Sequence, residues 1–178
     1  KDAEELEKEV ERESRKNEES IRRIREEVDK LSKDNDRKLK EIEKEVEDLR
    51  RRVDERRKRP GGEEFARKLI KELRDRLKEI AERIEKTNRE LKEKLERIAK
   101  EIEDLKKRNR EELKRLEEEK RGDEKLLDKI RKVVKENEER MDKLLEDIER
   151  VVRENIKKNK EVLERARRVI ERLEEKIK

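Results

Sequence analysis

The chain has no cysteine, histidine, tryptophan, tyrosine or glutamine, and it has only one phenylalanine, one proline and three glycines. Without cysteine it can form no disulfide, thiol nucleophile or zinc knuckle. Without histidine it lacks the usual base of a serine triad and the histidine ligands of a di-iron bundle. The three serines have no activating partner. We therefore expect no enzyme, and no catalytic, cofactor-binding or metal-binding residues.

Long apolar runs are missing as well, since no run exceeds two or three residues. This pattern predicts no signal peptide or other targeting signal and no membrane span, and therefore a soluble chain that is cytoplasmic if expressed recombinantly. Binding to a membrane surface is disfavoured too, because the apolar stripe has no tryptophan anchors and is needed for a core. We expect no membrane partner.

Charged residues make up 65% of the 178 residues, yet 60 basic and 55 acidic side chains are interleaved and leave a net charge of only +5. The arginine-rich stretch 50–59 is a candidate for gripping phosphates. It is better explained by cations at the end of a helix, which complement the helix dipole. Lys106, Lys107 and Arg108 are read as a solvated face. Because aromatic residues for stacking on bases are missing, we expect no nucleic-acid partner.

The last third of the chain repeats itself after eighteen residues. Residues 126–143 read LLDKIRKVVKENEERMDK, residues 144–161 read LLEDIERVVRENIKKNKE, and residues 162–178 read VLERARRVIERLEEKIK. Eighteen residues make about five turns of an α-helix at 3.6 residues per turn. The same spacing recurs near the N-terminus, in Leu6, Ile24 and Ile42 and in Val10, Val28 and Val46. A stripe with this period runs straight along a helix, so we expect essentially untwisted helices and not a heptad supercoil.

Helix breakers occur in only two places, Arg59-Pro60-Gly61-Gly62 and Arg121-Gly122-Asp123-Glu124. Proline disfavours helical backbone in the residue before it. Gly122 suits the left-handed position after a helix, and Asp123 is suited to cap the next one. These breaks predict three helices of nearly equal length, at about 2–59, 63–120 and 123–178.

Each predicted helix has a narrow apolar stripe that it cannot bury alone. Short loops force consecutive helices to be antiparallel neighbours. We therefore expect an all-α fold, a single-chain antiparallel (up-down-up) three-helix bundle, in which residues 1–178 form one elongated domain. Phe65, which follows the first loop, is expected to close one end of this bundle.

Asparagine is the one polar residue that favours the apolar stripes. Of the seven asparagines, all but Asn88 lie on a stripe, and Asn88 lies beside the only threonine, Thr87. Asn17 and Asn35 are eighteen residues apart, and so are Asn137 and Asn155. Folding the chain as a bundle gathers the polar residues at two levels. The first asparagine layer is Ser14, Asn17, Asn109 and Asn137, and the second asparagine layer is Asn35, Thr87, Asn88, Asn155 and Asn159.

These layers could bind a polar ligand or ion, or they could form hydrogen-bonded networks that fix the register of the helices. We favour the structural interpretation, because the amides can satisfy one another and a buried amide without a partner costs about 1–3 kcal/mol. A shifted register would place amides against leucine and is therefore penalised.

The chain resembles a computationally designed helical bundle with buried hydrogen-bond networks. The features that carry the resemblance are the period of residues 126–178, the two short loops, and Asn17, Asn35, Asn137 and Asn155. It implies an idealised scaffold with no natural biochemical activity and no required partner, and a monomer. The alternative is a protein–protein interaction or oligomerisation module, including a homo-oligomer, that uses the wide apolar stripe of residues 123–178.

High helix propensity and a continuous apolar stripe on every helix predict a thermostable protein. We expect a single cooperative thermal transition above about 70 °C, measured by circular dichroism at 222 nm. A cooperative transition below that temperature would contradict this expectation.

Overall fold

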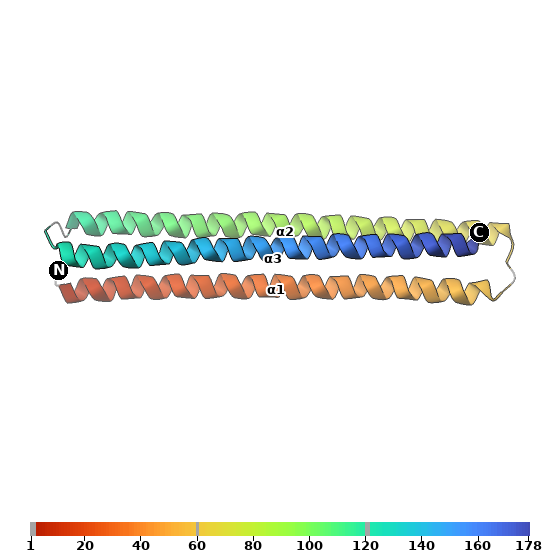
Figure 1. The fold of residues 1–178 in the computed structure, drawn as a ribbon, viewed down its shortest axis with the longest axis horizontal. Helices are drawn as coiled ribbons and strands as arrows, with labels where there is room; N and C mark the ends of the chain where they lie inside the picture. Colours follow the sequence, from red (N-terminus) through yellow and green to blue (C-terminus); the bar gives the residue numbers. More distant parts are fainter. Residues whose placement is uncertain (1–2, 60, 120–121) are drawn as a thin grey trace. The chain divides into compact units, whose positions relative to one another are not determined.

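The computed structural model describes residues 3–59, 61–119 and 122–178. The chain forms helices α1, α2 and α3, which comprise Ala3–Arg57, Glu63–Glu119 and Glu124–Ile177 (Figure 1). No strand occurs in these ranges. The predicted all-α, three-helix architecture is confirmed. Asp2, Pro60 and Arg121, which were expected at a helix end and in the loops, lie outside the described residues.

Helix α1 ends at Arg57, two residues before its predicted end. The backbone N–H of Lys58 donates to the carbonyl of Glu55 at 3.3 Å, and that of Arg59 donates to Arg56 at 3.1 Å. Such bonds to the third preceding residue tighten the last turn of a helix. The shorter helix is consistent with the restriction that a proline imposes on the residue before it.

Phe65 lies near the start of α2, and its side chain is 41% exposed. The guanidinium carbon of Arg56 lies 5.6 Å from the centroid of its ring, which is a cation–π contact. The ring also lies so close to Gly61 that a Cβ atom there would approach its Cδ1 to 2.8 Å. The expectation that Phe65 closes the end of the bundle is therefore wrong, because the ring covers the loop and an arginine instead.

The second loop has the predicted backbone and cap. Gly122 has a φ of 105°, in the left-handed region that favours glycine. The carboxylate of Asp123 accepts a hydrogen bond from the backbone N–H of Leu126 at 3.4 Å, and its carbonyl accepts from Leu127 at 3.1 Å. Asp123 is thus the N-cap residue of α3.

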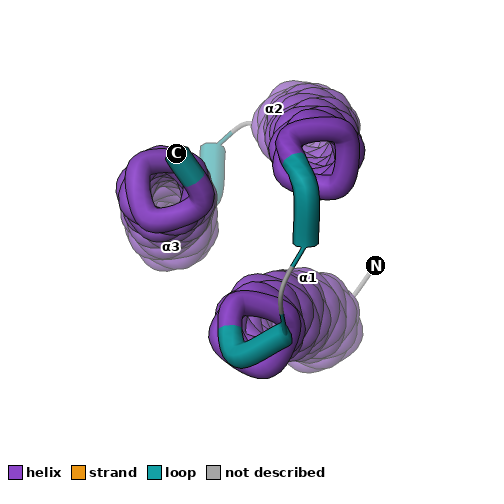
Figure 2. Tube along the Cα trace, turned by 90° about the vertical axis from the view of Figure 1, so that its right-hand side faces the viewer, coloured by secondary structure: helices purple, strands orange, loops and turns teal. Residues whose placement is uncertain are grey.

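The residues group into two compact units, and each contains one segment of every helix. The first unit comprises Lys1–Lys30 and Glu93–Val151, and the second comprises Leu31–Lys92 and Val152–Lys178. In each unit the segments of α1 and α3 run in the same direction and that of α2 runs opposite. In the view along the helices, the second unit faces the viewer and its three segments form a triangle (Figure 2).

Each unit buries its apolar stripes between all three helices. In the first unit, a core cluster consists of Leu6, Leu116, Leu126 and Ile130. In the second unit, one cluster includes Ile42, Ile80 and Ala166, and another includes Val53, Leu73 and Ile170. Burial of each large apolar side chain contributes about 1.5–3 kcal/mol, which is the main favourable term for packing the helices.

Ion pairs between α1 and α3 report how the two helices are aligned. Glu18 pairs with Arg140 at 3.3 Å, and these residues are 122 positions apart. The same separation holds for four further α1–α3 ion pairs, Glu7–Lys129, Arg25–Asp147, Asp36–Lys158 and Glu43–Arg165. Their positions on α1 repeat after eighteen residues, in Glu7, Arg25 and Glu43 and in Glu18 and Asp36. Taken over both units, the ion pairs therefore recur with the eighteen-residue period of the sequence.

We expect the cap at Asp123 to contribute measurably to stability. Replacing Asp123 with alanine removes the acceptor for the Leu126 N–H and should lower the free energy of unfolding by about 0.5–2 kcal/mol in urea titrations. Asp123→Asn keeps the acceptor and serves as the matched control, with a loss of only a few tenths of a kcal/mol. Equal losses in both variants would show that the charge matters and not the cap.

Candidate functional site

The second asparagine layer centres on a reciprocal pair between α1 and α3. Asn35 Nδ2 donates to Asn159 Oδ1, and Asn159 Nδ2 donates to Asn35 Oδ1, both at 3.0 Å. Asn35 Nδ2 also donates to Asn155 Oδ1 at 3.3 Å. Asn35, Asn155 and Asn159 are all at most 3% exposed. These amides form hydrogen bonds with one another in place of hydrogen bonds to water. Their burial therefore costs little free energy.

Two further bonds extend this layer. Asn159 Nδ2 donates to Asn88 Oδ1 on α2 at 2.7 Å, so all three helices contribute. Asn155 Nδ2 donates to the hydroxyl of Ser32 on α1 at 3.4 Å. Ser32 was not among the predicted residues. The eighteen-residue period could have identified it, because Ser32 follows Ser14 by one repeat, just as Asn35 follows Asn17.

Thr87 does not join these amides. Its hydroxyl donates to the backbone carbonyl of Arg83, one turn earlier on α2, at 2.9 Å. This local bond is common for threonine within a helix and satisfies the hydroxyl without a partner from another helix. Asn88, the next residue, provides the contribution of α2 to the layer.

The first asparagine layer has fewer bonds. Asn17 Nδ2 on α1 donates to Asn109 Oδ1 on α2 at 3.3 Å. Ser14 and Asn137 line the same small cavity as this pair. No hydrogen bond between described side chains joins either of them to the pair. The structure thus brings the four predicted residues together and links two of them directly.

One repeat of the sequence explains why the two layers differ. Eighteen residues before Asn35 and Asn155 of the second layer lie Asn17 and Asn137 of the first layer. The same step takes Asn159 to Met141, which is completely buried. It takes Asn88, on the antiparallel α2, to Lys106. Two of the amides that complete the second layer therefore have no amide counterpart in the first.

Lys106 is not on a solvated face, contrary to expectation, since it is only 9% exposed. Its Nζ donates to Asp142 Oδ1 on α3 at 2.5 Å and pairs with Glu103 at 3.6 Å. The hydrogen bond to Asp142 raises the pKa of Lys106 above its usual 10.5, and burial opposes this shift. The aliphatic stem covers apolar surface while the ammonium group reaches a carboxylate. Lys107 and Arg108 are exposed, as expected.

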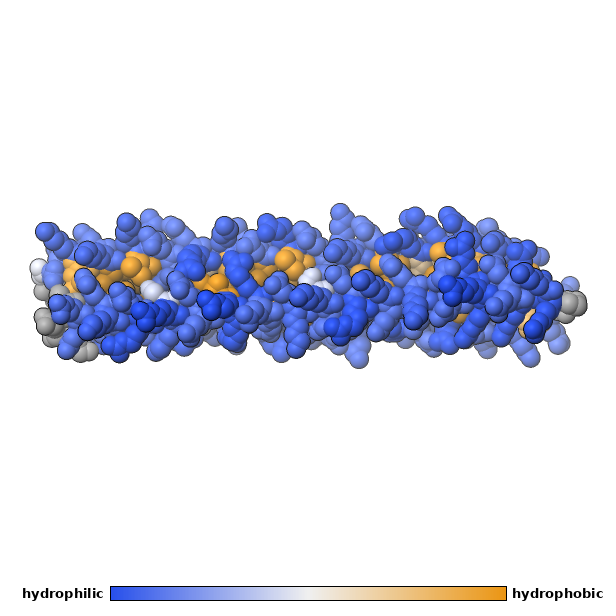
Figure 3. All heavy atoms as spheres, turned by 90° about the horizontal axis from the view of Figure 1, so that it is seen from below, coloured by the Kyte–Doolittle hydropathy of each residue, from blue (hydrophilic) through white to orange (hydrophobic). Residues whose placement is uncertain are grey.

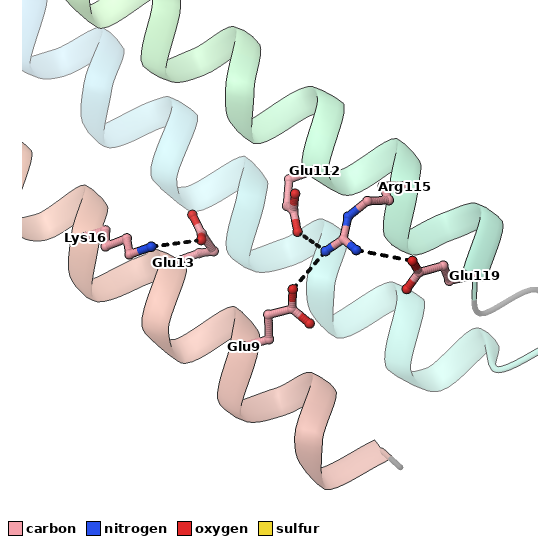
Figure 4. A network of polar contacts seen from close by, with 6 residues as sticks. All are labelled: Glu9, Glu13, Lys16, Glu112, Arg115 and Glu119. Carbon is pink, nitrogen blue, oxygen red and sulfur yellow. Dashed lines mark hydrogen bonds and ion pairs between the residues drawn. The ribbon is translucent and has the colours of Figure 1, made fainter. Parts of the chain in front are cut away.

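Carboxylates surround the outer edge of the first layer, and described cations engage them. Arg115 on α2 binds Glu112, and also Glu9 on α1 at 2.8 Å and Glu119 at 3.2 Å (Figure 4). Hydrogen bonds to Glu112 and Glu9 raise the pKa of Arg115 further. Lys16 pairs with Glu13 at 3.6 Å (Figure 4). This edge therefore consists of ion pairs.

Over the described ranges, no group of three or more histidine, cysteine, aspartate or glutamate residues is placed to hold a metal ion. None of the helices, as far as they are described, has a stretch apolar enough to cross a membrane. The arrangement that distinguishes this chain is the pair of asparagine layers.

A computationally designed three-helix bundle of known structure is similar to this chain. The two superpose with a TM-score of 0.60 and 24% sequence identity, over 98% of this chain and 86% of the other. At this identity the likeness establishes the fold, a three-helix bundle. No protein-family model and no curated protein matches the chain.

We expect Asp142 to control the ionisation of Lys106. Stability from the raised pKa is present below pH 10.5, the ordinary value, and is lost as the pH rises through the higher folded-state pKa. The pKa of Lys106, followed through its 13Cε shift, should fall in Asp142→Asn. Glu146→Gln, an exposed change one turn further along α3, removes the same charge and should leave the pKa of Lys106 in place. An equal fall in both variants would contradict the specific bond.

Proposed function

We propose that the chain is an idealised, designed structural scaffold without catalytic activity, in which the asparagine layers set the register of the helices. The observation that carries this proposal is the second asparagine layer, where buried amides of α1 and α3 and the half-buried amide of Asn88 on α2 form hydrogen bonds with one another. The regular period and the likeness to a designed three-helix bundle support a designed origin. We also propose that residues 1–178 form one domain, because each helix contributes to both units.

The repeating apolar stripe does not by itself fix the register of the helices in such a chain. Sliding α3 by one repeat leaves most apolar residues facing apolar residues, because the stripe has the same period. The slide replaces the partners of Asn35. Moved one way, Asn35 faces Asn137 and Met141 in place of Asn155 and Asn159, and it loses its reciprocal bond. Moved the other way, it faces leucine and isoleucine. Each buried amide without a partner costs about 1–3 kcal/mol, which is enough to disfavour the slipped forms.

The alternative function is an interaction or oligomerisation module, and one observation favours it. Val133, Val151 and Val169 on α3 are eighteen residues apart and only half-buried. On one face, apolar atoms are visible between charged side chains in both units (Figure 3). Such partly covered stripes are where a further helix would pack. Under this alternative the purified chain is a dimer or larger species, whereas the scaffold proposal predicts a monomer.

The register proposal is tested by making the second layer apolar. The triple variant changes Asn35, Asn155 and Asn159 to leucine. Both amides of the reciprocal pair are removed together, so neither is left buried without a partner. We expect its free energy of unfolding to stay equal or rise, while its register becomes mixed. Mixed register would appear as several distances between spin labels on α1 and α3, where the parent chain gives one.

The single variant Asn35→Leu is the matched control. It leaves Asn159 without its reciprocal partner and should therefore be less stable than the parent by about 1–3 kcal/mol. Light scattering on all three proteins gives their masses and separates the scaffold from the oligomer. If the triple variant remained a uniform monomer with a single label distance and lower stability, the amides would stabilise the fold and not select its register.

A further inference from the structure

We propose that the cavity beside the first asparagine layer is a binding site for an internal water molecule, which accepts a hydrogen bond from Asn109 Nδ2. This inference goes beyond the scaffold role, because it assigns a ligand to one layer and none to the other. It does not require that the layers select register.

The first observation is a donor without a partner. Asn109 Nδ2 is the one side-chain nitrogen or oxygen atom, among those buried in the described residues, that has no hydrogen-bond partner. The residue is only 9% exposed. Its Oδ1 already accepts from Asn17, so the amide is fixed by its oxygen while both N–H groups need acceptors. A buried donor left in this state is costly, and native structures supply a partner to nearly all of them.

The second observation is space of a suitable size and lining. A cavity of about 30 Å³ lies against Asn109 and is also lined by Ser14, Asn17 and Asn137. One water needs about 10–15 Å³ measured in this way, together with two to four polar partners. The hydroxyl of Ser14 and the amide of Asn137 can accept the hydrogen atoms of a water that accepts from Asn109. The volume is thus sufficient for a water molecule.

The charges around the cavity decide the class of the ligand. Glu9, Glu13 and Glu112 line its outer side, and they repel an anion. A cation is disfavoured because it would have to face the N–H groups of Asn109. The same carboxylates are engaged by Arg115 and Lys16 (Figure 4). A neutral molecule that both accepts and donates hydrogen bonds meets all of these conditions.

The second asparagine layer provides the internal comparison. There, Asn88 and Asn159 supply bonds that their counterparts Lys106 and Met141 do not supply in the first layer. Lys106 reaches out to Asp142 instead, and Met141 has no comparable acceptor. The second layer is therefore closed by protein groups alone, whereas the first has an amide that faces a polar cavity. Water is expected in one layer only.

The test measures rotating-frame cross-relaxation between water and side-chain amide protons in the 15N-labelled chain. We expect the NH₂ group of Asn109 to show a direct cross-peak to water, and those of Asn35 and Asn159 to show none. In the rotating frame a direct cross-peak has the sign opposite to that of a signal from chemical exchange with water. The sign of the Asn109 cross-peak therefore separates bound water from exchange without a change to the residues that line the cavity.

A second measurement does not depend on observing that amide. Oxygen-17 relaxation dispersion counts long-lived internal waters, and Asn109→Leu, which fills the cavity, should lower the count by about one. Asn35→Leu is the matched control in the second layer and should not lower it. The proposal is overturned if Asn109 shows no direct cross-peak, if its cross-peak has the sign of an exchange signal, or if Asn109→Leu leaves the count unchanged. None of these outcomes bears on the distances that test register.

Discussion

Recurrence of the apolar stripe after eighteen residues is the constraint on which the other features depend. Because each helix presents the same face after five turns, each unit can bury the stripes of all three helices with the same spacing. The α1–α3 ion pairs keep one separation in both units for this reason. These pairs are largely exposed and contribute little energy individually, so they reflect the alignment that the core sets. The driving force is burial of leucine, isoleucine and valine.

A regular stripe stabilises packing but does not select one alignment among several. In the role proposed for them, the amides would supply this selection at a modest cost, since a hydrogen bond between buried amides contributes about as much as the bonds to water that it replaces. Their value lies in the penalty for a mismatch. In the second layer the reciprocal pair of Asn35 and Asn159 makes this penalty large, because both amides lose partners together. The first layer has one direct bond between amides and is the weaker of the two.

The sequence predicted the three helices, the breaks between them and the cap at Asp123, because these depend on local chemistry and on period. It also predicted which polar residues lie on the stripes, and six of those asparagines are buried. It did not predict which atoms pair. Thr87 donates a hydrogen bond to its own helix, Ser32 accepts one from Asn155, and Lys106 on α2 donates one to Asp142 on α3. These choices depend on side-chain rotamers and on shifts of a single turn between neighbours, which periodicity does not resolve. Phe65 was misplaced because its cation–π contact with Arg56 depends on the loop conformation.

The constant separation of the α1–α3 ion pairs has a consequence for the length of the chain. Adding or removing one whole repeat in every helix would return each side chain to an equivalent neighbour, whereas a change of seven or eleven residues would leave the stripe rotated by about 20°. The bundle is therefore modular, with a building block of eighteen residues on each helix. Extended or shortened relatives of this chain could be assembled from the same parts, with the number of asparagine layers chosen independently of the length.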